Sequence, residues 1–453
     1  MARGKKKETL TPEERLQVAL VPESEQPYKM PGNWCWMRGS AFLKSMETKR
    51  PEGEVFRYID IDSIDNKRQQ VTNPKILQVK DAPSRASRKL RAGDTVFSMV
   101  RPYLMNIAYI DETISNSIAS TGFYVCTPTE NVNPLYLYYL MTSPYTVDGL
   151  NQYMKGDNSP SIRKDDIENY AYPLPPLPEQ QRIVDCIESL FAKLDEAKQK
   201  AQDALDSFET RKAAILHKAF TGELTAKWRE ERGVGMDSWE KKSVGELCIS
   251  LKYGTAKKSD ASGNVVVLRM GNLQQGEIDW SDLAYSNDPD DIDRYKLFPG
   301  DVLFNRTNSA ALVGKTAIYR GEHPAIYAGY LIKLDYDHDK IIGDYLNYAL
   351  NTLDAKKYCN SVKTDGVNQS NINAKKIGAY SFNVPNIPEQ EKIVSVIQKL
   401  LSKEQQSKAA AEAVLDQIEL MKKSILARAF RGELGTNDPS EESAVELLKR
   451  TIL

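Results

Sequence analysis

The stretch VGKTA at 313–317 contains the Gly-Lys-Thr order with which a P-loop holds nucleotide phosphates. A P-loop also needs a glycine at position 309, where this chain has Ser309, so we interpret the match as accidental. The acidic stretch PDDIDR at 289–294 reads as a solvated turn rather than a metal site. The sequence also lacks GxGxxG after a strand, a GxSxG elbow, a nuclease-like carboxylate set and the Asn-Pro-Pro-aromatic motif of adenine methyltransferases. We therefore predict a chain that binds and does not catalyse.

Metal sites, disulfides and membrane spans are equally unsupported. The cysteines are odd in number and form no CxxC pair, and the three histidines lie far apart. The basic N-terminus MARGKKKE is followed by no apolar stretch, and no run approaches the roughly 18 apolar residues of a membrane span. We predict a reduced, cytoplasmic protein with no cofactor of its own. The cysteines are Cys35, Cys126, Cys186, Cys248 and Cys359.

Polar side chains in the predicted loops could contact nucleic acid. Arginine suits the edge of guanine, asparagine and glutamine suit adenine, and all can also hold phosphates. The net charge is only −1, but residues 44–101 carry 13 basic against 8 acidic side chains. Loops are also polar simply because they face water, and that reading stays open for every residue. The candidates are Arg68, Lys89, Arg91, Arg101, Tyr103, Arg269, Asn272, Arg306, Asn308, Lys315 and Gln369, with Tyr319 and Tyr330 nearby.

An internal repeat must position these residues. Residues 178–224 align without a gap on 388–434, and 21 of 47 positions are identical. Both copies begin with PEQ and end with the pair AFTGEL and AFRGEL. The same offset matches Gly156, Ile162 and Ile167 with equivalents 210 residues later. The chain is therefore two copies of one unit.

Each repeated block is predicted to be one long helix. Pro178 and Pro388 suit the first turn, and Gly222 and Gly432 suit the end. About 40 intervening residues would make a rod of roughly 60 Å. Apolar residues follow a heptad seam, from Ile183 to Ile215 and from Ile393 to Ile425, including Val414 and Met421.

The seam calls for a partner helix, and the simplest partner for each copy is the other one. Two like units related by an approximate two-fold axis would place the helices antiparallel, a polarity that heptads alone do not give. Arg211 interrupts the seam in the first copy, and Glu404 and Ser407 interrupt it in the second. The stretch 404–411 is alanine-rich and is predicted to be locally loose. An alternative is that the helices dimerise the protein with itself.

The segments before the helices, roughly 31–175 and 236–385, diverge while their helices agree. Both mix strand-like and helical stretches, begin at a tryptophan, carry a Gly-Asp turn before an apolar strand and end in a polar Gly/Asn loop, 155–167 or 363–377. We predict two compact α/β domains. The fold class is α+β, with these two domains separated by two long antiparallel helices in a pseudo-two-fold coiled coil.

Together these features resemble a known family. LPPLPEQQRIV with AFTGEL, NIPEQEKIV with AFRGEL, RAGDTVFSMVRPYL and LFNRTNSAALVGKTA are similar to the specificity subunit of type I restriction–modification systems, over residues 10–450. The resemblance implies an N-terminal segment at 1–30 that packs near the C-terminal region. It further implies a first target recognition domain at 31–175, a central helical region at 176–235, a second domain at 236–385 and a C-terminal helical region and tail at 386–453.

The resemblance also implies partners. Each domain would read one half of a bipartite, asymmetric target in double-stranded DNA, while the helices set the spacing. Two methyltransferase subunits would dock on the exposed faces of 179–217 and 389–430, and up to two restriction subunits would add. S-adenosylmethionine, ATP and magnesium would belong to those partners. Two rival readings stay open, a stand-alone DNA-binding regulator and a nuclease or methyltransferase with an unrecognised site.

Overall fold

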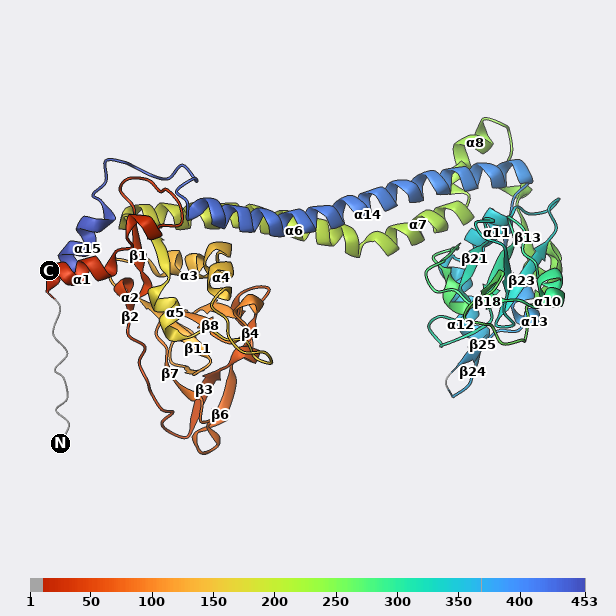
Figure 1. The fold of residues 1–453 in the computed structure, drawn as a ribbon. Helices are drawn as coiled ribbons and strands as arrows, with labels where there is room; N and C mark the ends of the chain where they lie inside the picture. Colours follow the sequence, from red (N-terminus) through yellow and green to blue (C-terminus); the bar gives the residue numbers. More distant parts are fainter. Residues whose placement is uncertain (1–10, 368, 453) are drawn as a thin grey trace. The chain divides into compact units, whose positions relative to one another are not determined.

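A computed structural model describes residues 11–367 and 369–452 of the chain (Figure 1). The chain divides into two compact units. Unit 1 contains the residues up to Lys200 together with those from Ala413 onward, and unit 2 contains Ala201–Glu412. Each unit therefore combines one divergent domain with parts of both repeated helices.

The first repeated block is broken, whereas the second is continuous. The first forms α6 (Leu177–Asp206) and α7 (Phe208–Phe220), and the second forms the 43-residue α14 (Ile387–Ala429). At the break, the Ser207 hydroxyl donates to the carbonyl of Asp203, and Arg211 Nη2 donates to the carbonyl of Ala204. Such side-chain bonds compete with the helical backbone bonds. The looseness predicted for 404–411 is wrong, because α14 runs through it without a break.

The two helices are antiparallel within each unit. In unit 1, Lys198 pairs with Glu419 at 2.8 Å and Asp195 pairs with Lys422 at 2.6 Å. Residue numbers thus rise along one helix as they fall along the other, so the two helices run in opposite directions. Ile183, Ile187, Ile393 and Ile397 are fully buried, as the seam predicted, but Val414 and Met421 are 39% and 49% exposed. The seam therefore leaves these two side chains partly in solvent, which its spacing did not predict.

The polar breaks in the seam meet each other in unit 2. Arg211 Nε lies 2.7 Å from Glu404 Oε2, and both side chains are half-buried. The equivalent positions of the other copy, 210 residues away, are Met421 and Leu194. The helix pair thus has a charged layer in unit 2 where unit 1 has apolar residues. A polar pair at a seam position fixes the register of a coiled coil.

Unit 1 folds around two four-stranded sheets, ordered β6-β3-β10-β7 and β2-β11-β8-β9. Strand β10 runs parallel to β3, and the other pairings in these sheets are antiparallel. The elements are α1 (Pro12–Ala19), η1 (Glu23–Glu25), β1 (Cys35–Arg38), α2 (Gly39–Phe42), β2 (Leu43–Lys44), β3 (Val55–Ile59), η2 (Ile61–Ser63), β4 (Ile64–Asp65), β5 (Gln70–Val71), β6 (Lys75–Gln78), η3 (Val79–Asp81), β7 (Ala86–Lys89), β8 (Thr95–Ser98), η4 (Pro102–Leu104), β9 (Ile107–Tyr109), β10 (Ile118–Ser120), β11 (Phe123–Pro128), α3 (Pro134–Thr142), α4 (Pro144–Asn151), α5 (Lys164–Asn169), β12 (Ala171–Leu174) and α15 (Ala444–Ile452).

Unit 2 repeats this plan with a four-stranded sheet β14-β23-β19-β21 and a three-stranded sheet β18-β15-β22, in which β15 and β22 are parallel. Unit 2 contains a further three-stranded sheet, β20-β25-β24, in the region of the polar loop at 363–377. The elements are η5 (Glu223–Thr225), α8 (Ala226–Glu230), η6 (Met236–Ser238), β13 (Glu240–Ser243), α9 (Val244–Leu247), β14 (Cys248–Tyr253), β15 (Val265–Leu268), η7 (Met270–Asn272), β16 (Leu273–Gln274), β17 (Glu277–Ile278), β18 (Tyr285–Ser286), α10 (Pro289–Arg294), β19 (Val302–Asn305), β20 (Thr307–Asn308), β21 (Thr316–Ile318), β22 (Ala325–Tyr327), β23 (Leu331–Tyr336), α11 (Gly343–Leu350), α12 (Leu353–Val362), β24 (Thr364–Asp365), β25 (Ser370–Asn371), α13 (Ala374–Gly378) and β26 (Ser381–Val384).

The end of each repeated helix packs into the core of a domain. This is not the domain from which that helix starts but the other one. Phe430, at the end of the second copy, packs edge-on against Tyr136 of the first domain, with ring centroids 5.4 Å apart. Phe220, at the end of the first copy, packs against Tyr345 of the second domain at 4.9 Å. The glycines that follow, Gly222 and Gly432, have φ of 82° and 74°, which only glycine adopts readily.

The PEQ motif joins each helix start to its domain. Gln180 accepts the backbone N–H of Asn133 and donates to the carbonyl of Pro175. Gln390 makes the equivalent bonds to Ile342 and Pro385. Both glutamines are fully buried, so their amide groups must be satisfied internally. The repeat is therefore explained by two identical joints.

The glutamate of the PEQ motif also holds the start of its helix in place. In unit 2 it joins the start of α14 to the segment that follows α7. Glu389 is fully buried and accepts from Arg229 at 2.6 Å and from the indole of Trp239 at 3.0 Å. In unit 1, Arg182 forms a two-pronged pair with Glu441 at 2.7 and 2.8 Å. Helices α1 and α15 lie side by side in this unit (Figure 1).

The acidic stretch 289–294 is not the solvated turn that the sequence suggested. It forms α10, which Asp288 caps, and Asp291 is buried and accepts a hydrogen bond from the hydroxyl of Thr255. Lys257 lies 2.7 Å from Asp288 and 3.5 Å from Asp291. These carboxylates stabilise a helix end.

Candidate nucleic-acid interface

Three polar segments of unit 1 converge on one edge of the first domain. The turn between β4 and β5 carries Arg68, whose side chain is 75% exposed. Asn66 of this turn donates to the carbonyl of Leu104, which ties the turn to η4 and thus to Tyr103. The third segment, residues 155–161, bonds to Arg101 through Pro160 and Asn158. The structure therefore brings Arg68, Arg101 and Tyr103 together.

Arg101 adopts an unusual backbone conformation. Its φ is 48° and its ψ 58°, a left-handed geometry that non-glycine residues rarely adopt, and Met105 at the other end of η4 has φ of 55°. The Arg101 N–H donates to the carbonyl of Pro160 at 2.8 Å, which holds the residue in place. Non-glycine residues in such conformations cluster at functional sites. Tyr103, two residues later, is 47% exposed.

Lys89 and Arg91 lie together around one carboxylate, Glu47. Lys89 Nζ lies 2.8 Å from Glu47 Oε2, and Arg91 pairs with the other oxygen. Hydrogen bonds from Arg91, then from Lys89, lower the pKa of Glu47 to about 2. The carboxylate therefore stays charged and balances part of this basic stretch.

The second domain carries its candidates on the sheet β20-β25-β24. Asn308 lies in β20, and Arg306 directly precedes that strand. Gln369 is exposed and lies in the hairpin between β24 and β25, next to β20. Arg306 stacks over the ring of Tyr253 at 4.9 Å, and its Nη1 and Nη2 make hydrogen bonds of 3.3 Å to Gly329 and Asn371.

The polar edges of the two domains are equivalent. In unit 1 the Ile162 N–H donates to the carbonyl of Met99 at 2.9 Å, and in unit 2 the Ile372 N–H donates to that of Arg306 at 2.8 Å. Two residues after each acceptor stand Arg101 and Asn308. The same backbone frame thus presents different side chains in the two domains.

Three further candidates have partners within unit 2. Asn272 is buried, and its amide accepts from the Arg269 N–H and donates to the carbonyls of Asp279 and Asp282. Because these bonds use its donors and an acceptor, Asn272 holds a loop in shape and is not free to contact a base. Arg269 pairs with Asp282 at 3.0 Å, and Lys315 donates to Gln274 at 2.7 Å.

The aromatic side chains separate into buried and exposed ones. Tyr319 is buried and donates to the carbonyl of His323, so it does not face solvent. Tyr330 is 49% exposed. Tyr253, which is 41% exposed and lies beneath Arg306, was not predicted as a site residue. The sequence of its strand does not show that Arg306 lies over its ring. Sequence reasoning also missed Asn66, whose role depends on a contact 38 residues away.

Other kinds of site find little support in the described part of the chain. No group of three or more histidine, cysteine or carboxylate side chains within 11–367 and 369–452 could hold a metal ion. All five cysteines are free thiols. None of the helices described is both long and apolar enough to cross a membrane.

Comparisons with known proteins agree with this geometry. The family model "Type I restriction modification DNA specificity domain" matches residues 37–205 and again 236–414. The specificity subunit of the type I restriction enzyme StySPI from Salmonella potsdam is 25% identical over 68% of this chain and 67% of its own length. The specificity subunit of EcoKI from Escherichia coli K12 is 27% identical over 62% of this chain and 61% of its own. The alignments thus span about two thirds of these relatives.

Solved structures share the fold. The crystal structure of the HsdS subunit from Thermoanaerobacter tengcongensis is 26% identical, with a TM-score of 0.66, over 91% of this chain and 100% of that one. A chain from a study of complex assembly and conformational transition of the type I R-M system is 25% identical, with a TM-score of 0.72, over 90% and 100%.

Proposed function

Because the chain belongs to the family of type I restriction–modification DNA specificity subunits, we propose that each of its domains reads one half of a bipartite target in double-stranded DNA. The equivalent polar edges carry this proposal. Arg101 and Asn308 occupy matching places, and arginine suits guanine whereas asparagine suits adenine. Since the two edges differ, the target is asymmetric.

We propose Arg68, Arg101 and Tyr103 as the reading residues of the first domain, and Arg306, Asn308 and Gln369 as those of the second. Exposure and convergence support this choice. Lys89, Arg91, Arg269 and Lys315 stay predicted as DNA contacts, with no choice between base and phosphate. Within their domains they pair with Glu47, Asp282 and Gln274.

The helices α6, α7 and α14 set the spacing between the half-sites and dock two methyltransferase subunits. Exposed apolar side chains that lie close together on α14 support docking, since a grouped apolar surface marks an interaction site whereas a single exposed apolar residue does not. They are Val414, Leu420 and Met421, which are 39%, 65% and 49% exposed. One of the similar solved structures was determined to explain the assembly of the type I R-M system.

In that assembly, the partners supply adenine-N6 methylation and, with up to two restriction subunits, ATP-dependent cleavage. S-adenosylmethionine, ATP and magnesium then belong to the partners. Because such a complex acts on cellular DNA, the proposed place of work is the cytoplasm.

Reconstitution tests this division of labour. The purified chain alone should neither methylate nor cleave DNA, and methyltransferase subunits added to it should methylate adenine at one split sequence. Methylation or cleavage by the chain alone would support the rival enzyme instead. Tight sequence-specific binding by the chain alone, with no methylation after subunits are added, would support a stand-alone regulator.

A further inference from the structure

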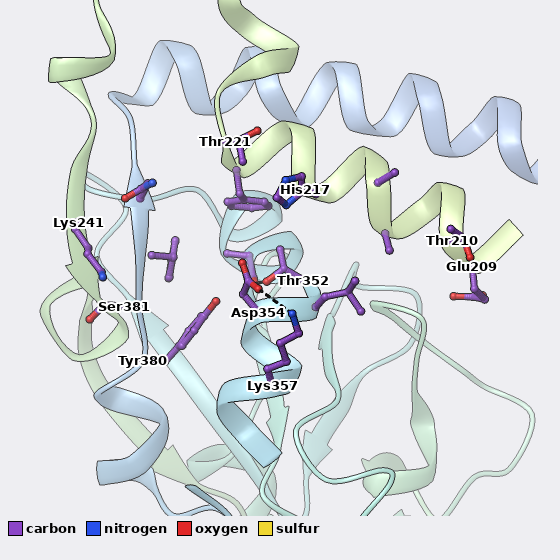
Figure 2. A pocket seen from close by; sticks show the side chains of 17 residues that line it. Glu209, Thr210, His217, Thr221, Lys241, Thr352, Asp354, Lys357, Tyr380 and Ser381 are labelled. Carbon is purple, nitrogen blue, oxygen red and sulfur yellow. Dashed lines mark hydrogen bonds and ion pairs between the residues drawn. The ribbon is translucent and has the colours of Figure 1, made fainter. Parts of the chain in front are cut away.

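A groove of about 800 Å³ opens in unit 2 between α7, α12 and the strand pair β13–β26. Figure 2 shows His217 and Thr221 on one wall, Asp354 and Lys357 on another, and Lys241, Tyr380 and Ser381 at one end. The groove is separate from the proposed DNA-contact site, since none of the side chains proposed to contact DNA lines it.

The equivalent place in unit 1 is filled by the chain itself. Strands β1 and β12 pair as β13 and β26 do, with Trp36 opposite Pro173 and Lys241 opposite Asn383. In unit 1 the segment Leu20–Tyr28 covers this place, and we call it the N-terminal strap. Leu20 bridges to Met37 on the outer edge of β1, and the Val21 N–H donates to the carbonyl of Trp36 at 2.9 Å.

The strap ends with an aromatic anchor. The Tyr28 hydroxyl donates to the carbonyl of Phe430 at 2.8 Å, and its ring packs against Trp36 at 4.8 Å and Tyr145 at 5.6 Å. Arg431 lies over the same ring at 5.6 Å. In unit 2 the residues that correspond to Arg431 and Trp36 are Thr221 and Lys241, and both line the groove. The groove therefore corresponds to the seat of Tyr28.

Unit 2 has no strap of its own among the described residues. The segment that links η5 to β13 is short and forms α8 and η6. Within that described part, β13 pairs only with β26, so its outer edge offers unpaired backbone groups. Trp36 is 2% exposed under the strap, whereas Lys241 is exposed. A free strand edge beside a groove is the usual receptor for an extended peptide.

We propose that this groove receives an extended peptide segment of a protein partner, with the chemistry of the strap. An apolar residue pairs along the edge of β13, an aromatic side chain enters the groove between Thr221 and Tyr380, and a carboxylate meets Lys241. The carboxylate follows from the charge of Lys241, the counterpart of Trp36. The strap's own carboxylate, Glu25, pairs with Arg38, two residues farther along β1. Lys241 makes no ion pair in the part of the chain described, while its neighbour Lys242 is paired with Glu240 at 2.8 Å.

A labelled peptide with the strap sequence, VALVPESEQPYKMP (residues 18–31), tests the groove on the full-length chain. Fluorescence anisotropy should show saturable binding, weakened at least tenfold by Tyr28→Ala in the peptide. Thr221→Trp in the chain should weaken it as much by filling the groove. Lys218→Trp, an exposed position one turn earlier that does not line the groove, should leave binding unchanged.

Absence of saturable binding up to about 1 mM, the weak end of specific association, would overturn the proposal. Binding that Thr221→Trp does not affect would also overturn it, because the peptide would then sit elsewhere, for example in exchange with the strap of unit 1.

The identity of the partner rests on the proposed function, so it is tested in the assembled complex. A photo-crosslinking group at Lys241 should capture an extended segment of the methyltransferase subunit. Methylation is measured on the same sample. A complex that methylates its target but gives no such cross-link overturns the groove assignment and leaves the proposed function standing, whereas loss of methylation in the unmodified complex bears on the function.

Discussion

At the scale of single residues, contacts within each domain separate the cations at the proposed reading edge from those that share a distant carboxylate. Arg68 and Arg101 share one edge with Tyr103, whereas Lys89 and Arg91 share the carboxylate of Glu47. All four cations looked alike in the sequence. The difference lies in a partner more than 40 residues away, which no local pattern reveals.

Replacing Arg101 by glycine should remove base recognition without harming the fold. Glycine adopts a φ of 48° without strain, so the η4 turn is kept. Loss of one arginine–base contact costs about 1–3 kcal/mol, or roughly 5- to 150-fold in affinity. Binding of the methyltransferase complex to its target oligonucleotide measures the effect. Arg91→Ala is the control and should cost less than about threefold, and equal losses for both variants would contradict the assignment.

The carboxylate of Glu47 should contribute stability that depends on pH. Its pKa is about 2 in the folded chain and 4.5 in the reference state, so the folded form favours the charged group. The contribution is therefore complete above pH 4.5 and is lost as the pH falls toward 2. We expect the denaturation midpoints of the wild type and Glu47→Gln to differ most near neutral pH and to converge on acidification. A difference that stays constant with pH would mean that ionisation of Glu47 plays no part.

At the scale of elements, the charged layer between α7 and α14 distinguishes the two halves of an otherwise repeated helix pair. Arg211 and Glu404 are 35% and 23% exposed, so the pair is partly desolvated. Met421 and Leu194 hold the equivalent positions. One polar layer in an apolar seam penalises other registers and other partners.

Glu404→Leu alone should destabilise the chain by about 1–2 kcal/mol, less than the 3–5 kcal/mol of a fully buried pair, because Arg211 loses its partner. The double variant Arg211→Met/Glu404→Leu copies the layer of the other half and should be as stable as the wild type or more so. Thermal denaturation of the wild type, both single variants and the double variant gives the coupling energy. Additive losses in the double variant would show that the two side chains act independently.

Much of the architecture was predictable, because an internal repeat and regularly spaced apolar residues specify it. The two copies, the helix starts at Pro178 and Pro388 and the helix ends follow from spacing and turn chemistry. The antiparallel pairing follows from the approximate two-fold relation of two like units. The break at Ser207, the exposure of Val414 and Met421 and the helix at 289–294 did not, since each depends on side-chain hydrogen bonds or tertiary burial. The burial of Asn272 and Tyr319 was missed for the same reason.

At the scale of the whole molecule, we propose that the domains read the DNA sequence and that the helices set the spacing. The identical joints at PEQ and at AFTGEL or AFRGEL support this division, because they attach both domains to the helices in the same way. The domains can then differ in what they read while the helices remain alike.

Deleting seven residues from each helix at facing positions should shorten the spacer and leave both half-sites unchanged. A heptad preserves the seam and removes about 10 Å of helix, which corresponds to at most about three base pairs at 3.4 Å each. The methylated sequence of the variant complex gives the spacer directly. An altered half-site, or an unaltered spacer in an active complex, would contradict the assignment of spacing to the helices.

The central claim is that this chain selects a split, asymmetric DNA target for adenine methylation. Long-read methylome sequencing of the host, with the chain present and deleted, tests it most directly. The account predicts that one bipartite motif with two different half-sites loses adenine methylation on deletion and regains it when the chain is restored. An unchanged methylome in cells that express the chain and its methyltransferase partner would contradict the account.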